Sequence, residues 1–433
     1  MRRFQSWMWC VLMLLVASTA FGEPASVTKI DTGDTAWMLA SAALVMLMTP
    51  GLALFYSGMV HRKNVLGTMM HSYILLGLIT VQWMLWGYSL AFGPDIHSVI
   101  GSLKWVALSG VGAQPSPDYA PTIPHNVFMV YQMMFAIITP ALIFGAVAER
   151  MKFSAMIVFS LLWATLVYDP ICHWVWGVGG WIRNLGALDF AGGTVVHISS
   201  GFSALVAALV LGARRGDRKL EPHNMTLTVL GAGILWFGWF GFNGGSALGA
   251  NGLAGTAFVN THIASAAATL SWIVIEWWQR GKPSVLGVAS GCVAGLVAIT
   301  PAAGFVAPLG ALCIGLLGGA ACYYGVTLKN RFRFDDTLDT FGVHGVGGTV
   351  GALLTGVFCT VAVNPSGANG LFLGNPKQLL SQAIGVGATI TYSVVVTWIL
   401  LKIVDAMIGL RVTNEEEEQG LDQTQHGETG YNL

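Results

Sequence analysis

Long apolar blocks recur along almost the whole chain, and they constrain the fold more than any other feature. A membrane-spanning helix needs about 20 mainly apolar residues to cross a hydrocarbon core of ~30 Å. The 433-residue chain contains eleven such blocks, at residues 36–58, 68–92, 126–148, 154–176, 192–212, 226–244, 255–278, 285–302, 304–325, 341–361 and 380–402. Only 10% of the residues are charged, against about 25% in a typical soluble domain. The sequence therefore predicts an all-α integral membrane protein with eleven transmembrane helices.

The first 22 residues, MRRFQSWMWCVLMLLVASTAFG, have the features of a secretory signal peptide. Arg2 and Arg3 precede a short apolar core, and small residues follow around Ala20 and Gly22. An additional membrane helix is the alternative, but the apolar run over residues 7–16 is short for a span. We expect a signal peptide over 1–22, an extracytoplasmic N-terminal segment over 23–35 and a membrane domain over 36–403.

Basic residues occur in alternate loops, and this distribution predicts the orientation of the chain. Lysine and arginine accumulate in the cytoplasmic loops of membrane proteins. One set of loops contains thirteen of them: Arg62, Lys63, Arg150, Lys152, Arg214, Arg215, Arg218, Lys219, Arg280, Lys282, Lys329, Arg331 and Arg333. The opposite loops and the mature N-terminus contain four: Lys29, Lys104, Arg183 and Lys377. We therefore expect the N-terminus outside and the C-terminus inside, the orientation that a signal peptide also predicts.

Two histidines lie in apolar, glycine-rich stretches of the fifth and tenth predicted spans. His197 follows Asp189 by eight residues in DFAGGTVVHISSG, and His344 follows Asp339 by five in DTFGVHGVGGTVG. Two five-helix units joined in series must face opposite ways across the bilayer, so we predict two inverted five-helix repeats plus one extra helix. At a rise of ~1.5 Å per residue, both histidines are expected roughly 12–16 Å from opposite boundaries. They would then meet near the midplane.

A buried imidazole needs partners for both ring nitrogens, because an unsatisfied polar group in hydrocarbon is costly. A structural hydrogen bond between helices is one interpretation, and a redox protein with a bis-histidine haem is another. Desolvation favours neutral species, so a histidine pair in an apolar lumen suits ammonia. No carboxylate or cysteine lies within a turn of either histidine, which argues against zinc. We predict no metal and no cofactor, and the balance of 21 basic and 21 acidic residues argues against nucleic acid.

Several strings identify a known family. They are TPGLALFYSGMVHRKNVL, FGAVAERMKFSA, ALDFAGGTVVHISSG, WFGWFGFNGGSAL, ITPAAGFV, FGVHGVGGTVG and the tail GLRVTNEEEEQGLDQTQHGETGYN. From about residue 34 to residue 432, the chain resembles bacterial ammonium transporters of the Amt/Mep/Rh superfamily. The resemblance implies a homotrimer in the bacterial cytoplasmic (inner) membrane, in contact with lipid, with a pore inside each subunit lined by His197 and His344. It also implies a transporter, not an enzyme.

The resemblance places the family's outer recruitment site on Trp176, Phe135 and Ser246. These residues would form an aromatic cage with a hydroxyl acceptor, and Tyr131, one turn before Phe135, is a further candidate for substrate binding in this cage. The stacked gate of the family falls on Phe135 and Phe242. The predicted topology agrees, since Trp176 ends the fourth span, Ser246 follows the sixth, and Phe242 lies one helical turn deeper than Ser246.

Two further residues are weighed at the outer side. Asp189 is expected to cap the N-terminus of the fifth helix, with direct attraction of cations as the alternative; the family's essential aspartate falls here. Thr300 belongs to the predicted outer turn between the eighth and ninth spans, where its hydroxyl is a candidate acceptor in the vestibule.

The predicted function is a transporter or channel that recruits NH4+, deprotonates it and conducts NH3, with methylammonium as an alternative substrate. Whether the proton crosses separately is left open. The resemblance also implies that the cytoplasmic tail, residues 404–433, packs on the inner face and contacts the PII nitrogen-regulatory signal protein. A sensor that signals through this tail is the alternative function.

Overall fold

The computed structural model describes residues 29–215 and 222–431. The predicted signal peptide lies outside the described residues. The long helices follow one another along the chain as α2 (Thr32–Met59), α3 (Val65–Gln82), α5 (His125–Ile143), α6 (Phe153–Trp163), α9 (Ser199–Leu211), α10 (Met225–Gly244), α11 (Gly252–Arg280), α12 (Val285–Ile299), α13 (Pro308–Phe332), α14 (Val346–Phe358) and α15 (Pro376–Ile408). Shorter helices complete the set: α4 (Tyr88–Phe92), α7 (Asp169–Trp176), α8 (Trp181–Asn184), α16 (Asn414–Gln419) and α17 (Leu421–His426). The described part of the chain is therefore almost entirely helical.

Ten helical runs in the described residues are long and apolar enough to cross a membrane, so the chain is a multi-pass membrane protein. The eighth of the eleven predicted spans, residues 285–302, is α12, which has 15 residues. At ~1.5 Å per residue this helix is roughly 22 Å long, shorter than a ~30 Å core. The chain then continues through the fully buried turns at residues 300–304 before α13 begins at Pro308. The part of the membrane thickness that α12 does not span is therefore crossed by irregular backbone, which is packed inside the protein.

Four spans contain a short π-helical segment. These are η2 (Trp83–Gly87), η5 (Ala164–Tyr168), η6 (Gly193–Ile198) and η8 (Phe341–Gly345). Single π-helical turns widen a helix locally and are frequent at functional sites. Two of them carry the predicted histidines: His197 lies in η6 and His344 in η8.

The two histidine-bearing helices pack against each other through glycine. A Cβ atom added to Gly201 in α9 would lie 2.1 Å from the backbone nitrogen of Gly345 in η8. Only glycine fits at this position, because any Cβ atom would collide with the Gly345 backbone. Small residues let helix backbones approach closely in membranes. This packing brings His197 and His344, four residues before Gly201 and one before Gly345, to the same place in the core.

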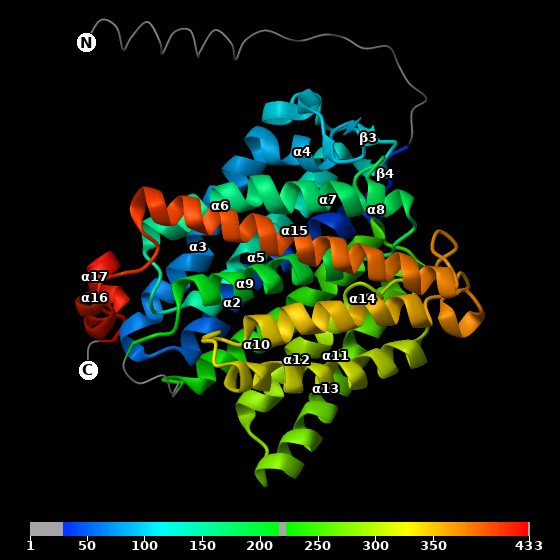
Figure 1. Ribbon diagram of the computed structural model, residues 1–433. Coiled ribbons are helices and arrows are strands. Elements are labelled where there is room, and N and C mark those ends of the chain that lie inside the picture. Colours follow the sequence, from blue (N-terminus) through cyan, green and yellow to red (C-terminus); the bar gives the residue numbers. More distant parts are fainter. Residues whose placement is uncertain (1–28, 216–221, 432–433) are drawn as a thin grey trace, which may run out of the picture.

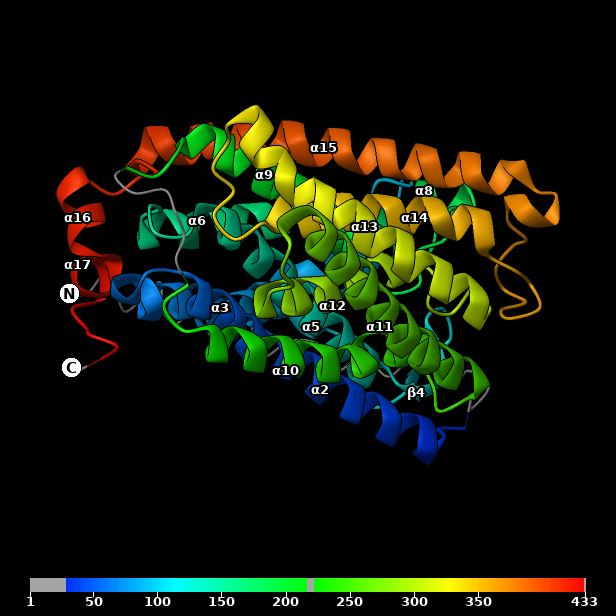
Figure 2. The same ribbon diagram turned by 90° about the horizontal axis from the view of Figure 1, so that it is seen from below.

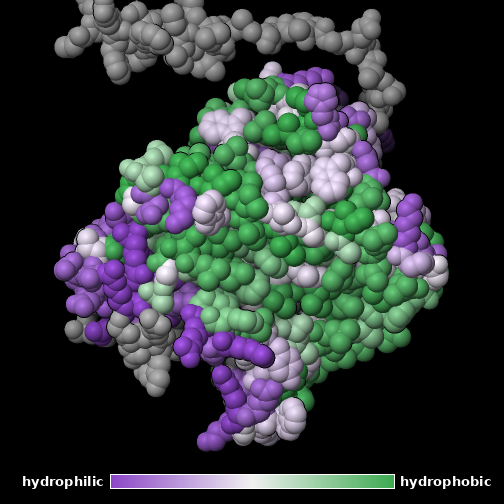
Figure 3. Space-filling view, in the orientation of Figure 1, coloured by the Kyte–Doolittle hydropathy of each residue, from purple (hydrophilic) through white to green (hydrophobic). Residues whose placement is uncertain are grey.

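The helices form one bundle with two distinct ends. The C-terminal helices α16 and α17 lie at one end, and β4 (Ala120–Pro124) and α8 lie at the other end in both views (Figures 1 and 2). Near β4 the chain forms two small antiparallel ribbons, which pair β1 (Asp95–Ile96) with β2 (Ile100–Gly101) and β3 (Pro115–Ser116) with β4. Between the ends the surface is mainly hydrophobic, whereas hydrophilic residues gather over the C-terminal helices (Figure 3). This arrangement suits a bundle whose long axis crosses the bilayer.

Candidate functional site

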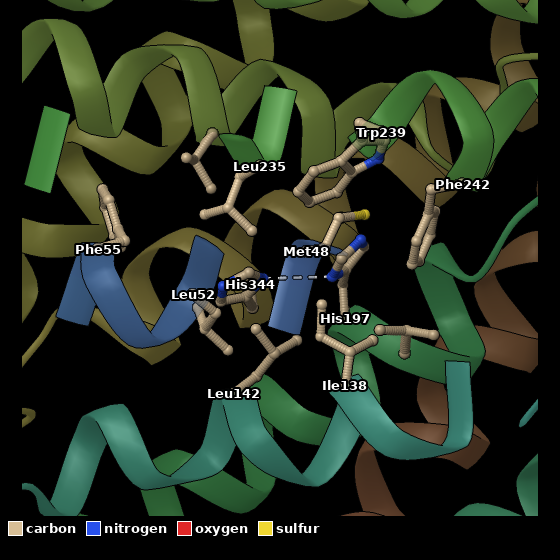
Figure 4. Close-up of a pocket in the computed structure, with 12 residues that line it drawn as sticks. Met48, Leu52, Phe55, Ile138, Leu142, His197, Leu235, Trp239, Phe242 and His344 are labelled. Carbon is tan, nitrogen blue, oxygen red and sulfur yellow. Dashed lines mark hydrogen bonds between the residues drawn. The ribbon is translucent and has the colours of Figure 1, made fainter. Parts of the chain in front are cut away.

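His197 and His344 face each other at the centre of the bundle (Figure 4). Their Nδ1 atoms lie 3.2 Å apart, and their rings lie 5.2 Å apart with an interplanar angle of 24°. Both side chains are buried, with exposed fractions of 1% and 4%. Because one nitrogen of this contact must donate and the other must accept, the two rings hold complementary tautomers.

An aspartate eight residues before each histidine caps the histidine-bearing helix. The carboxylate of Asp189 accepts from four backbone N–H groups, those of residues 192–195, at 2.7–3.0 Å. The carboxylate of Asp336 accepts from the N–H groups of Thr340 and Phe341 at 3.0 and 2.7 Å. The counterpart of Asp189 is therefore Asp336, and the predicted match with Asp339 is wrong. Each capping aspartate precedes its histidine by eight residues. Asp339 instead forms an ion pair with Lys329.

A narrow cavity with an empty volume of about 350 Å³ surrounds the two histidines. Apart from the imidazoles, apolar side chains line it: Met48, Leu52, Phe55, Ile138, Leu142, Val196, Leu235, Trp239, Phe242 and Val293 (Figure 4). His197 stacks on Trp239, with ring centroids 5.5 Å apart. Its Nε2 atom is buried and has no hydrogen-bond partner among the described residues. This nitrogen is free to exchange a hydrogen bond with a small solute.

Phe135 and Phe242 separate this central cavity from a larger one. Their ring centroids are 4.3 Å apart at an interplanar angle of 40°. Phe242 lines the central cavity, and Phe135 lines an outer cavity with an empty volume of about 1150 Å³. The two rings therefore close the route between the cavities.

The outer cavity brings Trp176, Phe135 and Ser246 together in its wall. The rings of Phe135 and Trp176 meet edge to face at 5.8 Å, and the indole N–H of Trp176 donates to the carbonyl oxygen of Asp189 at 2.8 Å. The Ser246 hydroxyl donates to the carbonyl oxygen of Phe242 at 2.9 Å, which leaves its lone pairs available as acceptors. The cavity thus offers aromatic faces beside a hydroxyl acceptor.

Tyr131 lies behind this wall. Its side chain is fully buried, and its hydroxyl donates to the carbonyl oxygen of Phe242 at 2.7 Å and lies 3.1 Å from the Ser246 oxygen. It is absent from the residues that line the outer cavity. The geometry gives it contact with Ser246 and with the Phe135 ring, at 5.0 Å, in place of the cage position expected from the sequence.

Thr300 is also placed differently from the sequence expectation. It is fully buried, accepts from the indole N–H of Trp239 at 2.9 Å and donates to the carbonyl oxygen of Leu296 at 2.7 Å. It therefore orients a ring of the central cavity and does not reach the vestibule. Sequence reasoning missed Trp239, and the signal was its spacing of three residues before Phe242, on the same face of α10.

A third cavity continues from the histidines toward the end of the bundle that carries the tail. Its empty volume is about 330 Å³, and it shares Phe55, Val293 and His344 with the central cavity. Tyr56, Ser290, Asp339 and Thr340 are among its lining residues. The three cavities therefore lie in series, and the lining changes from polar to apolar and back to polar.

The site does not fit a haem. Axial histidines bind iron from opposite faces of a wide macrocycle, whereas these two rings stack on each other with facing nitrogens 3.2 Å apart. Within residues 29–215 and 222–431, no three His, Cys, Asp or Glu side chains are grouped as metal ligands. The chemistry at the centre is that of two imidazoles in an apolar passage.

A narrow passage through a multi-pass helical bundle, with polar residues in the lining at both ends and a wide cavity at one of them, defines a membrane transport protein. The chain belongs to the Ammonium Transporter Family, whose model matches residues 36–431. It is 54% identical over 400 residues to an ammonium transporter from Bacillus subtilis (strain 168), which covers 92% of this chain and 98% of that protein. It is 51% identical over 426 residues to an ammonium transporter from Aquifex aeolicus (strain VF5), with 98% of each chain covered.

Comparison of the fold with solved structures leads to the same family. The crystal structure of Mep2 from Saccharomyces cerevisiae is similar with a TM-score of 0.84 and 40% sequence identity, and the match covers 90% of this chain and 89% of that one. Members of this family are transporters and not enzymes, so the chain is a transporter.

Proposed function

We propose that this ammonium transporter recruits NH4+ in the outer cavity, releases a proton from it at the gate to the water of that cavity, and passes NH3 along His197 and His344. Family membership supports ammonium as the substrate. The stacked histidines in an otherwise apolar passage are the observation that carries the proposed mechanism.

Recruitment follows from the lining of the outer cavity. A cation over an aromatic face gains about 0.5–2 kcal/mol, and more when it is desolvated. Trp176 and Phe135 supply such faces, and the Ser246 oxygen accepts one N–H bond from the ion. This combination concentrates a small cation with hydrogen-bond donors and needs no fixed negative charge at the cage.

Deprotonation follows from the change of environment beyond the gate. An ion that enters the central cavity loses its hydration shell, because the lining of this cavity consists of imidazoles and apolar side chains. Burial of an unpaired charge there is costly, so the neutral form is favoured. Ammonia gives and takes hydrogen bonds, and the complementary tautomers of His197 and His344 present one donor and one acceptor beyond their mutual bond.

The test replaces each histidine by alanine. We expect the purified variants to keep wild-type yield and oligomeric state and to lose or alter conduction, because the variant passage lacks a hydrogen-bonding group at its centre. Methylammonium uptake and ammonium-evoked current in proteoliposomes measure conduction. His262→Ala is the matched control, since His262 lies in the span α11 and lines none of the three cavities. Wild-type rate and selectivity in both pore variants would overturn the mechanism.

The same proposal covers assembly and orientation. We infer a homotrimer in the bacterial inner membrane, with inverted repeats that place the outer cavity outside and the tail inside. The equal spacing of eight residues in both Asp–His pairs supports the repeat. The tail is held on the bundle by the bond of the Arg215 backbone N–H to Glu417 at 2.7 Å and by the bond of the Gly67 N–H to Asp422 at 2.8 Å, which supports a face on which a PII protein could dock.

A further inference from the structure

We propose that His173 is a positioning residue for ammonium capture: held as an imidazolium between two acceptors, it fixes the helix end that carries Trp176. The proposal rests on the proposed function of the outer cavity and adds a residue three positions before the cage tryptophan.

Both ring nitrogens of His173 face acceptors. Nδ1 lies 3.0 Å from the carbonyl oxygen of Ala91, and Nε2 lies 2.8 Å from a carboxylate oxygen of Asp95. A carbonyl oxygen accepts only, so Nδ1 carries a proton, and a carboxylate completes the pair when Nε2 carries one too. The ring has an exposed fraction of 0% and the Asp95 side chain one of 28%. The geometry therefore describes a charged pair at the protein surface with its cationic member buried.

The Asp95 carboxylate is suited to this role. Burial acts to raise its pKa, but the hydrogen bonds from the His173 ring and from the Ser98 N–H, at 3.0 Å, outweigh burial and hold the pKa below its usual value. The carboxylate therefore stays ionised as the outside medium becomes mildly acidic.

The pair is connected directly to Trp176. The turn after α7 passes over it: a Cβ atom at Gly177 would lie 2.5 Å from the His173 Nδ1 atom, and one at Gly179 would lie 2.6 Å from the Asp95 Cβ atom. The Gly177 N–H donates to the His173 carbonyl oxygen at 2.9 Å. Trp176 lies between these anchored positions, so movement of the ring shifts the cage wall.

The β1–β2 ribbon is locked to the same helix end. The Trp174 indole N–H donates to the Val99 carbonyl oxygen at 2.7 Å. The Trp181 backbone N–H donates to the Ser98 carbonyl oxygen at 3.2 Å. Asp95 belongs to this ribbon, so the charged pair closes a continuous set of contacts between the ribbon and α7. Loss of the pair would leave the ribbon held by these two bonds alone.

Other titratable and charged groups near the pair are already engaged or lie beside Asp95. His97 lies next to Asp95 in the ribbon and lowers its pKa slightly. Asp169, one turn before His173 on α7, accepts from the Gln82 amide at 2.8 Å. Arg183 donates to the Trp176 carbonyl oxygen at 2.5 Å, and the Tyr119 hydroxyl donates to the Phe92 carbonyl oxygen at 2.9 Å. The acidic partner of the His173 Nε2 atom is therefore Asp95.

The test measures uptake by His173→Gln and Asp95→Asn in proteoliposomes at pH 6, with KM expressed as the concentration of ammonium ion. We expect KM to rise about tenfold in both variants, the loss of roughly one charge-assisted hydrogen bond, with the maximal rate nearly unchanged. Lys104→Gln, an exposed charge in the same loop region, is the control and should follow the wild type.

Failure of this inference differs from failure of the proposed function. If the wild type transports ammonium and His173→Gln keeps the wild-type KM, His173 has no positioning role. If His173→Gln does not fold, Asp95→Asn decides, because Asp95 is partly exposed and its substitution leaves the ring in place. A wild-type KM in folded Asp95→Asn would also overturn the proposal.

Discussion

At the residue scale, the proposed mechanism assigns each step to single side chains. In this proposal Ser246 supplies the hydroxyl acceptor of the outer cavity, the Phe135 and Phe242 rings close the route, and His197 begins the apolar segment. Each proposed step depends on one chemical property: an acceptor, an aromatic face or a ring nitrogen. Substitutions that remove one property should therefore change one kinetic constant.

We expect Ser246→Ala to raise KM for ammonium about tenfold and to leave the maximal rate nearly unchanged, because one hydrogen bond to a cation is lost during capture. Initial uptake rates at increasing ammonium concentration measure both constants. Thr256→Ala, an exposed hydroxyl on α11, is the control. A fall in maximal rate at constant KM would place Ser246 after the capture step.

At the element scale, close helix contacts position the site. The glycine contact between α9 and η8 sets the distance between the two histidines, and capping carboxylates fix where η6 and η8 begin. At the tail end, Glu149 joins three segments of chain. It accepts from the His61 ring at 2.8 Å and from Arg214 at 2.9 Å, and Arg214 also binds Asp335 at 2.9 Å.

We expect Gly201→Ala to lower the free energy of unfolding by about 1–3 kcal/mol, the usual cost of overpacking, and to reduce conduction. The added methyl would meet backbone atoms of Gly345 that cannot move alone. Gly233→Ala on α10 is the matched control, because its Cβ atom would have no neighbour within 4 Å. Thermal unfolding of the purified proteins measures the difference, and equal midpoints for the two variants would contradict the expectation.

The His61–Glu149 pair should make stability depend on pH. Burial acts to raise the pKa of Glu149, but His61 and Arg214 lower it from 4.5 to about 2, so its contribution is present above pH 4.5 and is lost as the pH falls toward 2. The hydrogen bond to Glu149 raises the pKa of His61 above 6.5, so that contribution is present below pH 6.5 and is lost as the pH rises through the raised pKa.

We therefore expect His61→Gln to remove the part of the stability that the wild type loses as the pH rises above 6.5. Thermal unfolding midpoints across pH 5–9 measure it. His97→Gln, a histidine of the outer ribbon region, should keep the wild-type pH profile. If the unfolding midpoint of His61→Gln differed from that of the wild type by the same amount at every pH, protonation of His61 would play no part in the stability.

At the scale of the whole molecule, the two ends of the bundle differ in kind. One end holds the wide outer cavity and the short ribbons, and the other holds the tail helices and the Glu149 cluster. The helix α12 has only 15 residues and is followed by buried turns. The length of a helix alone therefore does not decide which segments lie within the bundle at membrane depth. Irregular backbone is tolerated at this depth because protein surrounds it.

The predicted orientation can be tested by labelling. We expect a cysteine at Ser109 to react with an impermeant maleimide in intact cells, and one at Glu415 to react after permeabilisation, because basic loops stay in the cytoplasm. Both positions are exposed. Cys172, Cys292, Cys322 and Cys359 are buried and Cys313 is partly exposed, so labelling of the unaltered chain measures the background. The opposite labelling pattern would invert the assigned direction of transport.

The sequence by itself determined that the chain is a multi-pass helical membrane protein and which family it belongs to, because hydrophobic transfer depends on local composition and the motifs are contiguous. Ten of the predicted spans coincide with helical runs long enough to cross a membrane, with ends that differ by up to eight residues, and the sequence singled out both histidines. Tertiary structure alone decided the features that join distant segments: Asp336 as the second cap, Tyr131 behind Ser246, Thr300 on Trp239 and His173 on Asp95. These contacts depend on how helices cross and on which face each turns inward, and neither is encoded at a fixed spacing along the chain.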